Sequence, residues 1–575
     1  MIYLEIIKIM DILKTKIIKK SIINKKCNMI EVEVNGKKIY FPLKYAPRPN
    51  QVEALNFIKQ EIQNKKRFFL LNMPMGSGKS FLMIMFANWY RNFINTDDEV
   101  KFDVLTNSKV LQSQYLKDFD FINNYKGKSN YYCQPFDCQC DAGKELCKIL
   151  KRPCDSCEYD KAKAAWIQSQ IGLTNFHLFD TLALFQQDTL KRRNGNVLII
   201  DECQNFELIF SNYLSSKTSS NTLKKCGFGL KEIESIDDKY ISNIKDLDKY
   251  LEFLEKKLIP MLEAKNQQFE YSINLSGSKK KIELTKFIQN IESNLLSFKH
   301  LFESYKNNPS NIVLDISINK SDKMYSGIEL ITQHIFVNEH LSDFIFSKYD
   351  HVIFMSATIL DPKMFSFING LDEKLTTYYE STSPFLLKNR PIYYIKIGKM
   401  NWTSKEETFK KQIPWIKKIL AKYKNSKGII HTTNYEIAEW VKENIMNERL
   451  LFHETDDKNN ILEKHLTSTE PTVLVSPSMI EGISLDDELA RFQIILKINY
   501  PNLSSSRIKA RQKMKPEWYN WSACVNTVQA SGRGVRNDED FCDTFILDSN
   551  FSDLLKYNSH ILPKYFTDAI KVLKI

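Results

Sequence analysis

The chain has 575 residues, of which 43% are hydrophobic and 26% are charged, and its formal net charge is +12. This composition excludes a wholly disordered chain, a collagen-like fibre and a small disulfide-rich scaffold. The moderate basic excess is compatible with nucleic-acid binding without demonstrating it, because many lysine-rich chains are merely soluble. At about 150 residues per domain, a chain of this length would contain three or four domains.

The sequence predicts a protein that does not span a membrane. No window of about 18 apolar residues is free of charged side chains. The apolar start of the chain is interrupted by Glu5, Lys8 and Asp11, so it lacks the continuous apolar core of a signal peptide. We therefore expect an intracellular protein, cytoplasmic or associated with the nucleoid, or in the host cytoplasm if the composition rich in Ile, Lys and Asn reflects a viral source.

Short apolar runs predict the strands of a parallel sheet. The first 28 residues show no recognisable chemistry, and residues 30–42 alternate around Asn35-Gly36, which predicts a β-hairpin. Polar residues follow directly after each of four apolar runs, at 67–71, 197–200, 352–355 and 473–475. Buried parallel strands with reactive groups at their carboxyl ends are typical of a doubly wound α/β sheet.

A helical region interrupts this pattern. Apolar residues recur at steps of three and four between 244 and 262, and again between 284 and 298. This spacing predicts two long amphipathic helices of a separate insertion. The polar, Ser- and Lys-rich stretch 267–281 between them predicts a loop.

A phosphate-binding loop is the strongest single motif. The sequence MPMGSGKS at 73–80 follows the 67–71 strand and precedes an apolar segment predicted to be helical. In such a loop, backbone N–H groups cradle phosphates, Lys79 reaches the β- and γ-phosphates, and the Ser80 hydroxyl binds Mg²⁺. The strict pattern has glycine at position 73, where this chain has methionine. The loop residues expected to contact ATP are Gly76, Ser77, Gly78, Lys79 and Ser80.

Two acidic residues support a nucleotide-hydrolysing site. Asp201 and Glu202 directly follow the 197–200 strand. An aspartate at this place can hold Mg²⁺ through water, and the next carboxylate can polarise the attacking water. A lone Asp-Glu pair is a weak signal, but this pair lies on the same inferred sheet as the phosphate loop.

The order of motifs resembles the XPD/DinG-like iron–sulfur helicases of superfamily 2. The resemblance runs from about Tyr45 to Asp548. Asp201-Glu202-Cys203-Gln204 stands where the family has its DEAH box, so Gln204 replaces the histidine that helps couple the two motor domains. The other matching segments are YAPRPNQ at 45–51, Thr106-Asn107, KGKSNYYC at 126–133, Ser356-Ala357-Thr358, Ser383-Pro384-Phe385, Glu481-Gly482 and QASGRGVR at 529–536.

The resemblance implies how the residues share the chemistry. Lys79, Asp201 and Glu202 would act from the first motor domain, and Arg533 and Arg536 would arrive from the second as arginine fingers, near a helix start after Gly532. Further contacts to ATP are expected from Arg48, Gln51, Glu481, Gly482 and Gln529, and Mg²⁺ is expected at Ser80 and Asp201.

The resemblance also implies the domain order. We expect an α/β chain of two RecA-like motor domains, each a parallel sheet with flanking helices. Motor domain 1 would comprise 29–132, 166–205 and 334–382, and motor domain 2 would comprise 383–575. An N-terminal extension (1–28), an iron–sulfur insertion (133–165) and a helical arch-like insertion (206–333) complete the chain.

Six of the 11 cysteines lie between Cys133 and Cys157. In a reducing compartment, such crowding favours a metal or cluster over disulfides. Spacing alone leaves a [4Fe–4S] cluster and zinc both open, because each takes four thiolates. The resemblance favours the [4Fe–4S] cluster. It implies Cys133 and Cys157 as the firmest ligands, with Cys147 and Cys154 between them and Cys140 as first substitute.

The expected partner is single-stranded and forked DNA, which a monomer would unwind in the 5′→3′ direction, as the resemblance implies. Basic and aromatic residues of the cysteine segment would suit a wedge at a fork, or would equally suit a solvated face. One alternative is a non-unwinding ATPase that remodels protein–nucleic-acid complexes, and another is a catalytically dead binding module with zinc. Roles in DNA repair, replication and transcription all stay open. The side chains considered for the wedge are Lys144, Lys148, Lys151, Arg152, Lys161, Lys163, Tyr131, Tyr132, Tyr159 and Trp166, and those considered for phosphate contacts are Thr106, Asn107, Thr432, Thr433 and Asn434.

Overall fold

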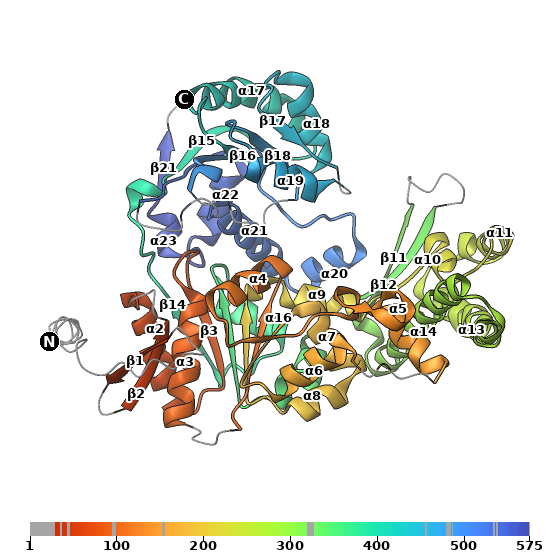
Figure 1. Cartoon of the computed structure of the whole chain (residues 1–575). Helices are drawn as coiled ribbons and strands as arrows, with labels where there is room; N and C mark the ends of the chain where they lie inside the picture. Colours follow the sequence, from red (N-terminus) through yellow and green to blue (C-terminus); the bar gives the residue numbers. More distant parts are fainter. Residues whose placement is uncertain are drawn as a thin grey trace.

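The computed structural model describes residues 29–34, 37–42, 47–94, 99–151, 154, 156–318, 327–454, 457–478, 485, 487–532, 535 and 539–573. Two seven-stranded parallel sheets, each flanked by helices, form two lobes, and a helical extension projects from the first (Figure 1). This arrangement confirms the predicted α/β class with two motor domains. The N-terminal extension and the site residues Glu481, Gly482, Arg533 and Arg536 lie outside the described residues.

The first sheet is parallel throughout, and its core strands are buried on both faces. All five residues of β3, β4 and β9 are buried, as expected for strands covered by helices on both sides. The predicted strands at 67–71, 197–200 and 352–355 are confirmed. In spatial order the strands are β14 (Thr376–Glu380), β3 (Phe68–Asn72), β13 (His351–Ser356), β9 (Val197–Asp201), β4 (Phe102–Thr106), β8 (Ile171–Asn175) and β5 (Asn123–Asn124).

Alternate residues of each strand face two different apolar clusters. Phe69 and Leu71 pack with the helices that follow the phosphate loop, whereas Phe68 and Leu70 pack with helices on the opposite face. The alternation follows from the two-residue period of a strand. One face is covered by α2 (Pro49–Gln63), α3 (Lys79–Phe93) and α4 (Lys109–Asp118), and the other by α7 (Phe176–Phe185), α9 (Phe206–Tyr213), α15 (Asn338–Phe344) and α16 (Pro362–Asn369).

The second sheet is also parallel, and it includes the strand predicted at 473–475. Its order is β17 (Leu450–Phe452), β18 (Val473–Ser476), β16 (Gly428–His431), β19 (Phe492–Ile495), β20 (Asp543–Asp548), β15 (Ile392–Gly398) and β21 (Ile570–Leu573). Its helices are α17 (Lys405–Lys422), α18 (Tyr435–Asn444), α19 (Lys458–Thr467), α20 (Ser506–Met514), α21 (Pro516–Ser531), α22 (Asn550–Asn558) and α23 (Lys564–Thr567). The predicted domain limits stay predictions, but the strands of the two sheets fall within 68–380 and 392–573.

Helices α20 and α21 join the two motor domains. The Trp521 indole of α21 donates a hydrogen bond to the Ile359 carbonyl at 3.1 Å, and the largest apolar cluster contains residues of both sheets. On α20, Arg507 and Arg511 both donate to the Glu207 carboxylate of α9, and all three side chains are buried. A buried charge is tolerated only when it is paired in this way.

Two insertions interrupt the first motor domain (Figure 1). The cysteine-rich one contains β6 (Tyr132–Cys133), β7 (Cys138–Gln139), α5 (Cys140–Ile149) and α6 (Glu158–Gln168). The arch-like one contains an antiparallel sheet and helices: β10 (Ser216–Ser219), β12 (Ile328–His334), β11 (Ile312–Ile318), α10 (Ser220–Lys225), α11 (Leu230–Lys239), α12 (Leu247–Phe253), α13 (Ile259–Leu275) and α14 (Ser278–Asn307). Gln289 of α14 donates to the Asp141 carbonyl of α5 at 2.8 Å, so the two insertions touch each other.

The arch differs from its prediction in two ways. The helix predicted over 244–262 contains a π-helical turn at Leu254–Leu258, just before Pro260 at the start of α13, because proline removes an N–H and crowds the preceding turn. The loop predicted at 267–281 is wrong. Helix α13 continues to Leu275, because Phe269 and Ile273 carry its apolar stripe into contact with Leu284 and Ile288. Only Ser276 and Gly277 separate α13 from α14.

The β-hairpin predicted at the start of motor domain 1 is confirmed. Strand β1 (Met29–Val34) pairs antiparallel with β2 (Lys37–Pro42). Across the part of the chain that the structure describes, we find no helix with the length and apolar character needed to cross a membrane.

Candidate nucleotide site and thiol cluster

The phosphate loop has the backbone that its glycines predict. Gly76 and Gly78 adopt left-handed φ angles of 70° and 81°, which glycine tolerates and other residues rarely adopt. Helix α3 begins at Lys79 directly after the loop, so its N-terminal N–H groups point to where such a loop would bind phosphate. Met73, where the strict pattern has glycine, is completely buried, and its N–H donates to the Ser356 carbonyl at 2.8 Å.

Residues at the N-terminal end of α2 donate hydrogen bonds to carbonyl groups of the phosphate loop. The Gln51 amide donates to the Gly78 carbonyl at 2.9 Å, and the Arg48 guanidinium donates to the Gly76 carbonyl. Asn50 donates to the Ser77 carbonyl at 3.4 Å. These bonds fix the loop carbonyls in this structure. The predicted contact of Arg48 and Gln51 with the nucleotide stays a prediction.

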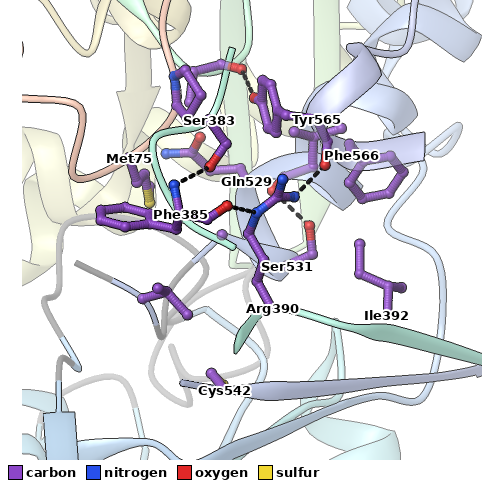
Figure 2. Close-up of a pocket in the computed structure, with 15 residues that line it drawn as sticks. Met75, Ser383, Phe385, Arg390, Ile392, Gln529, Ser531, Cys542, Tyr565 and Phe566 are labelled. Carbon is purple, nitrogen blue, oxygen red and sulfur yellow. Dashed lines mark hydrogen bonds between the residues drawn. The ribbon is translucent and has the colours of Figure 1, made fainter. Parts of the chain in front are cut away.

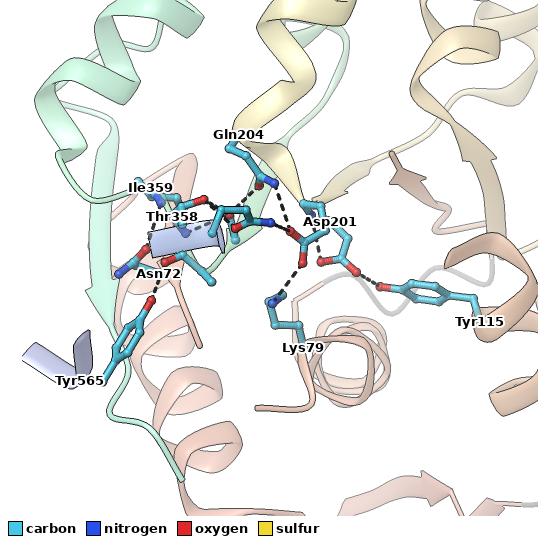
Figure 3. A network of polar contacts seen from close by, with 12 residues as sticks. Asn72, Lys79, Tyr115, Asp201, Gln204, Thr358, Ile359 and Tyr565 are labelled. Atoms are coloured by element: carbon cyan, nitrogen blue, oxygen red, sulfur yellow. Dashed lines mark hydrogen bonds and ion pairs between the residues drawn. The ribbon is translucent and has the colours of Figure 1, made fainter. Parts of the chain in front are cut away.

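Asp201 is the last residue of β9 and lies near Lys79 of the loop (Figure 3), and Glu202 directly follows it. The Lys79 ammonium is 3.4 Å from Glu202 Oε1. Burial raises the pKa of Asp201 to about 6, although the nearby Lys79 charge opposes this shift. Glu202 has a left-handed φ of 53°, an uncommon conformation for a residue other than glycine that often marks functional sites. The three predicted catalytic residues of motor domain 1 are thus brought together.

A closed ring of hydrogen bonds links Glu202 of the first motor domain to Gln529 of the second. Gln204 donates to Glu202 Oε2 at 3.2 Å and accepts from the Ser356 hydroxyl at 2.6 Å. The Thr358 backbone N–H donates to Ser356 Oγ at 3.0 Å, and the Thr358 hydroxyl donates to Gln529 Oε1 at 3.3 Å. The Gln529 amide donates to Glu202 Oε2 at 3.4 Å, which closes the ring. Gln204 therefore makes two bonds in the position of the expected histidine, using the donor and the acceptor of its amide.

The second motor domain contributes Gln529 to this part of the site. Gln529 lies in the last turn of α21, which ends at Ser531 and is followed by Gly532. The helix start expected after Gly532 falls on residues that are mostly outside the described part of the chain, so it stays a prediction. Arg533 and Arg536 follow outside the described residues, so their role as arginine fingers stays a prediction.

A pocket next to the loop lies between the motor domains (Figure 2). Phe385, from the predicted Ser-Pro-Phe segment, forms part of its wall with Met75. The Arg390 guanidinium donates to the Phe385 carbonyl at 3.2 Å, and the Tyr565 hydroxyl donates to the Ala357 carbonyl at 2.7 Å. Sequence reasoning missed Arg390 and Tyr565, because neither belongs to a local motif.

The six clustered cysteines gather in one part of the insertion. Cys140 Sγ lies 3.9 Å from Cys157 Sγ. A side chain added at Gly143 would come within 2.5 Å of Cys133 Sγ, so only glycine fits against that thiol. Burial raises the pKa of the Cys133 and Cys147 thiols, and the charges of neighbouring cysteines, Cys154 among them, raise both further. Burial and Cys157 raise the pKa of Cys140 to about 12.

The donor set suits a metal, although no coordination group is ready-made. Among the residues that the structure describes, no three His, Cys, Asp or Glu side chains form a preformed metal site. However, thiols that raise each other's pKa would be stabilised as thiolates by a bound cation, and four thiolates suit both an iron–sulfur cluster and zinc. Cys140, predicted only as a substitute ligand, is in direct contact with Cys157, so the choice of four ligands stays a prediction.

The aromatic residues considered for a wedge are mostly structural. Trp166 is completely buried, Tyr159 is 4% exposed, and the Tyr125 and Tyr159 hydroxyls are hydrogen-bonded. Lys144 pairs with Asp160. Tyr132, at 49% exposed, is the wedge candidate whose aromatic ring is open to solvent. Neither Tyr159 nor Trp166 is free to stack on a base.

Comparisons with known proteins agree with this geometry. Residues 416–568 match the model of the helicase C-terminal domain, and residues 44–208 match that of the type III restriction enzyme, res subunit. A solved structure named XPD_APO superposes with a TM-score of 0.60 at 14% identity, covering 92% of this chain and 100% of that one. The chain has an XPD-like helicase fold. Xpd4 of S. tokodaii gives a TM-score of 0.53 at 15% identity, covering 92% of this chain and 100% of its own.

Two curated relatives match over shorter segments. ATP-dependent DNA helicase CHL1 of Eremothecium gossypii is 21% identical over 149 residues, which are 21% of this chain and 18% of the relative. ATP-dependent DNA helicase chl-1 of Caenorhabditis elegans is 32% identical over 87 residues, 14% of this chain and 10% of the relative. Each match thus spans less than a fifth of the relative. The predicted resemblance to XPD/DinG-like helicases of superfamily 2 is confirmed.

Proposed function

We propose that this protein is an ATP-dependent DNA helicase that moves 5′→3′ along single-stranded DNA and opens forked duplexes. The observation that carries the proposal is the hydrogen-bonded ring between the two motor domains. Glu202, 3.4 Å from the phosphate-loop lysine, also bonds Gln529 of the second domain. A change at the γ-phosphate that moves Glu202 would therefore also shift Gln529 in the second domain. Such a link is what a motor needs to convert hydrolysis into domain movement.

The residues of the site divide the work of phosphoryl transfer. Lys79 and the loop N–H groups would hold the triphosphate, and Glu202 would orient the attacking water. Ser80 and Asp201 would hold Mg²⁺, which supplies charge neutralisation on the phosphates. Arg533 and Arg536 would add positive charge from the second domain. Arg48, Gln51, Glu481, Gly482 and Gln529 would complete the nucleotide contacts.

The cysteine insertion would hold a [4Fe–4S] cluster through Cys133, Cys147, Cys154 and Cys157, with Cys140 as the substitute and zinc as the alternative. When bound, the cluster would supply a cross-link for a polar insertion that has little apolar surface of its own. Because DNA is the proposed substrate, the protein would act inside the cell. In the simplest arrangement it would act as a monomer.

The direct test is ATP turnover measured with and without single-stranded DNA. The proposal expects Mg²⁺-dependent turnover that rises when single-stranded DNA is added. Absence of turnover under both conditions would reject it in favour of an inactive binding module. Turnover without strand separation would favour the alternative of a remodelling ATPase.

Replacing Gln204 with alanine is expected to slow DNA-stimulated ATP turnover about tenfold. The substitution removes a hydrogen bond to a charged carboxylate, worth about 1.5 kcal/mol, which corresponds to about a factor of ten in rate. The measurement is kcat in the presence of saturating single-stranded DNA. Gln204→His, which can also donate and accept, should recover most of the loss.

The ring also predicts non-additive effects. Ser356→Ala alone should lower kcat by about as much as Gln204→Ala. The double variant should be no slower than either single variant, because the two residues act through one hydrogen-bonded connection. Additive losses would mean that Gln204 and Ser356 act separately.

Replacing Cys157 with serine should remove the cluster and reduce strand separation at least about tenfold, while ATP still binds. The phosphate loop follows β3 and does not depend on the insertion. Iron content, anaerobic absorbance and strand displacement would be measured together. Cys226→Ser is the matched control, because Cys226 is a buried thiol in the arch that Asn294 contacts at 3.6 Å. A colourless wild-type protein with about one zinc would contradict the iron–sulfur assignment.

A further inference from the structure

Tyr115 of α4 donates a hydrogen bond to the carboxylate that is proposed to hold Mg²⁺ (Figure 3). The Tyr115 hydroxyl lies 2.8 Å from Asp201 Oδ2. The other oxygen, Oδ1, accepts from the Glu202 backbone N–H at 3.0 Å. Since the two donors bind different oxygens, together they fix the rotation of the carboxylate. Asp201 has no freedom to turn unless the phenol moves.

The phenol is itself held rigidly. Tyr115 is 2% exposed, and it shares an apolar cluster with Phe119, which directly follows α4, and with Leu82 and Met83 of α3. The Phe119 ring lies 6.2 Å from the Tyr115 ring and 5.1 Å from the Phe81 ring. Helix α4 is thereby packed on the helix that begins at the phosphate loop, and the hydroxyl is presented to Asp201 from a fixed direction.

We propose that Tyr115 is a positioning residue for ATP hydrolysis, whose hydroxyl orients Asp201 toward the water that binds Mg²⁺ and ties this carboxylate to α4. The inference rests on the proposed function. Tyr115 reaches the reaction only through Asp201. Mutation of a residue that orients a metal-binding carboxylate typically lowers metal affinity or activity by 10- to 100-fold.

Tyr115→Phe tests the proposal, because it removes the hydroxyl and keeps the packed ring. We expect the Mg²⁺ concentration for half-maximal ATP turnover to rise about tenfold and kcat to fall about tenfold, with the KM for ATP changed less than about twofold. A half-saturating concentration does not depend on the amount of active enzyme. A loss of folded protein therefore cannot imitate this shift.

Tyr349→Phe is a matched control from the same domain. The Tyr349 hydroxyl donates to Asp103 Oδ2 at 2.7 Å, and both side chains are buried. Asp103 lies near the beginning of β4, whereas Asp201 lies at the end of β9. The control removes the same kind of bond at the other end of the sheet, and the Mg²⁺ requirement should not change.

The outcomes separate this inference from the proposed function. An unchanged Mg²⁺ requirement in Tyr115→Phe, with normal hydrolysis by the wild type, would overturn the inference alone. An equal shift in both variants would overturn it too, because the effect would then be general. A wild-type protein without ATP turnover would overturn the proposed function itself.

Discussion

ATP turnover is expected to fall to background when Lys79 is replaced by alanine, while the fold is retained. The Lys79 ammonium is 3.4 Å from Glu202, and with nucleotide bound it would instead meet the β- and γ-phosphates. Catalysis of phosphoryl transfer consists largely of positioning and charge neutralisation, so this cation has no substitute among the loop residues. The loop should keep its shape, because Arg48 and Gln51 hold its carbonyl groups from outside.

The measurement is steady-state ATP turnover, with circular dichroism to show that the variant is folded. Lys66→Ala is the control. Lys66 precedes β3, whereas Lys79 follows it. The Lys66 ammonium donates to the Lys374 carbonyl at 2.6 Å. We expect normal turnover in the control. Turnover near the wild-type value in Lys79→Ala would refute the assignment of the phosphate loop.

Replacing Glu202 with glutamine should reduce kcat about 10³-fold with little change in the KM for ATP, because removal of a general base typically costs 10²- to 10⁴-fold. Glutamine has nearly the same shape and can still accept hydrogen bonds from Gln204 and Gln529, so the ring between the domains should persist. The loss would therefore report the carboxylate charge rather than a broken connection.

Single-turnover hydrolysis and nucleotide binding would be measured on the same Glu202→Gln preparation. Glu488→Gln is the control, since Glu488 is an exposed carboxylate of the second domain that pairs with Arg491 at 2.7 Å. Weakened binding in proportion to the lost rate would assign Glu202 to ground-state binding and contradict its role in orienting water.

Features that depend on neighbouring residues were predictable from the sequence. The strands could be found because they are short apolar runs with polar ends, and the loop because its glycines and Lys79 are contiguous. The loop prediction for 267–281 fails because most side chains of this segment are polar although it is largely helical. Its many polar side chains cover the exposed face of α13, while Phe269 and Ile273 alone continue the buried face.

Contacts between distant segments could not be read from periodicity. Tyr115 and Asp201 are 86 positions apart, and Gln529 meets Glu202 from 327 positions away. An amide both donates and accepts hydrogen bonds, so Gln204 in place of the histidine is compatible with coupling between the domains. In the ring, the Gln204 amide donates to Glu202 and accepts from Ser356. The sequence leaves open whether Tyr159 and Trp166 stack on nucleic-acid bases or lie elsewhere. Both side chains are buried, which excludes stacking.

Strand displacement on forked DNA tests the central claim most directly. The wild-type protein would be incubated with ATP and Mg²⁺ on a duplex with a 5′ single-stranded tail, and separately on one with a 3′ tail. The account predicts strand separation on the 5′-tailed and forked substrates that requires ATP hydrolysis and is lost in Lys79→Ala. Rapid ATP turnover on the same DNA without separation of any duplex would contradict it.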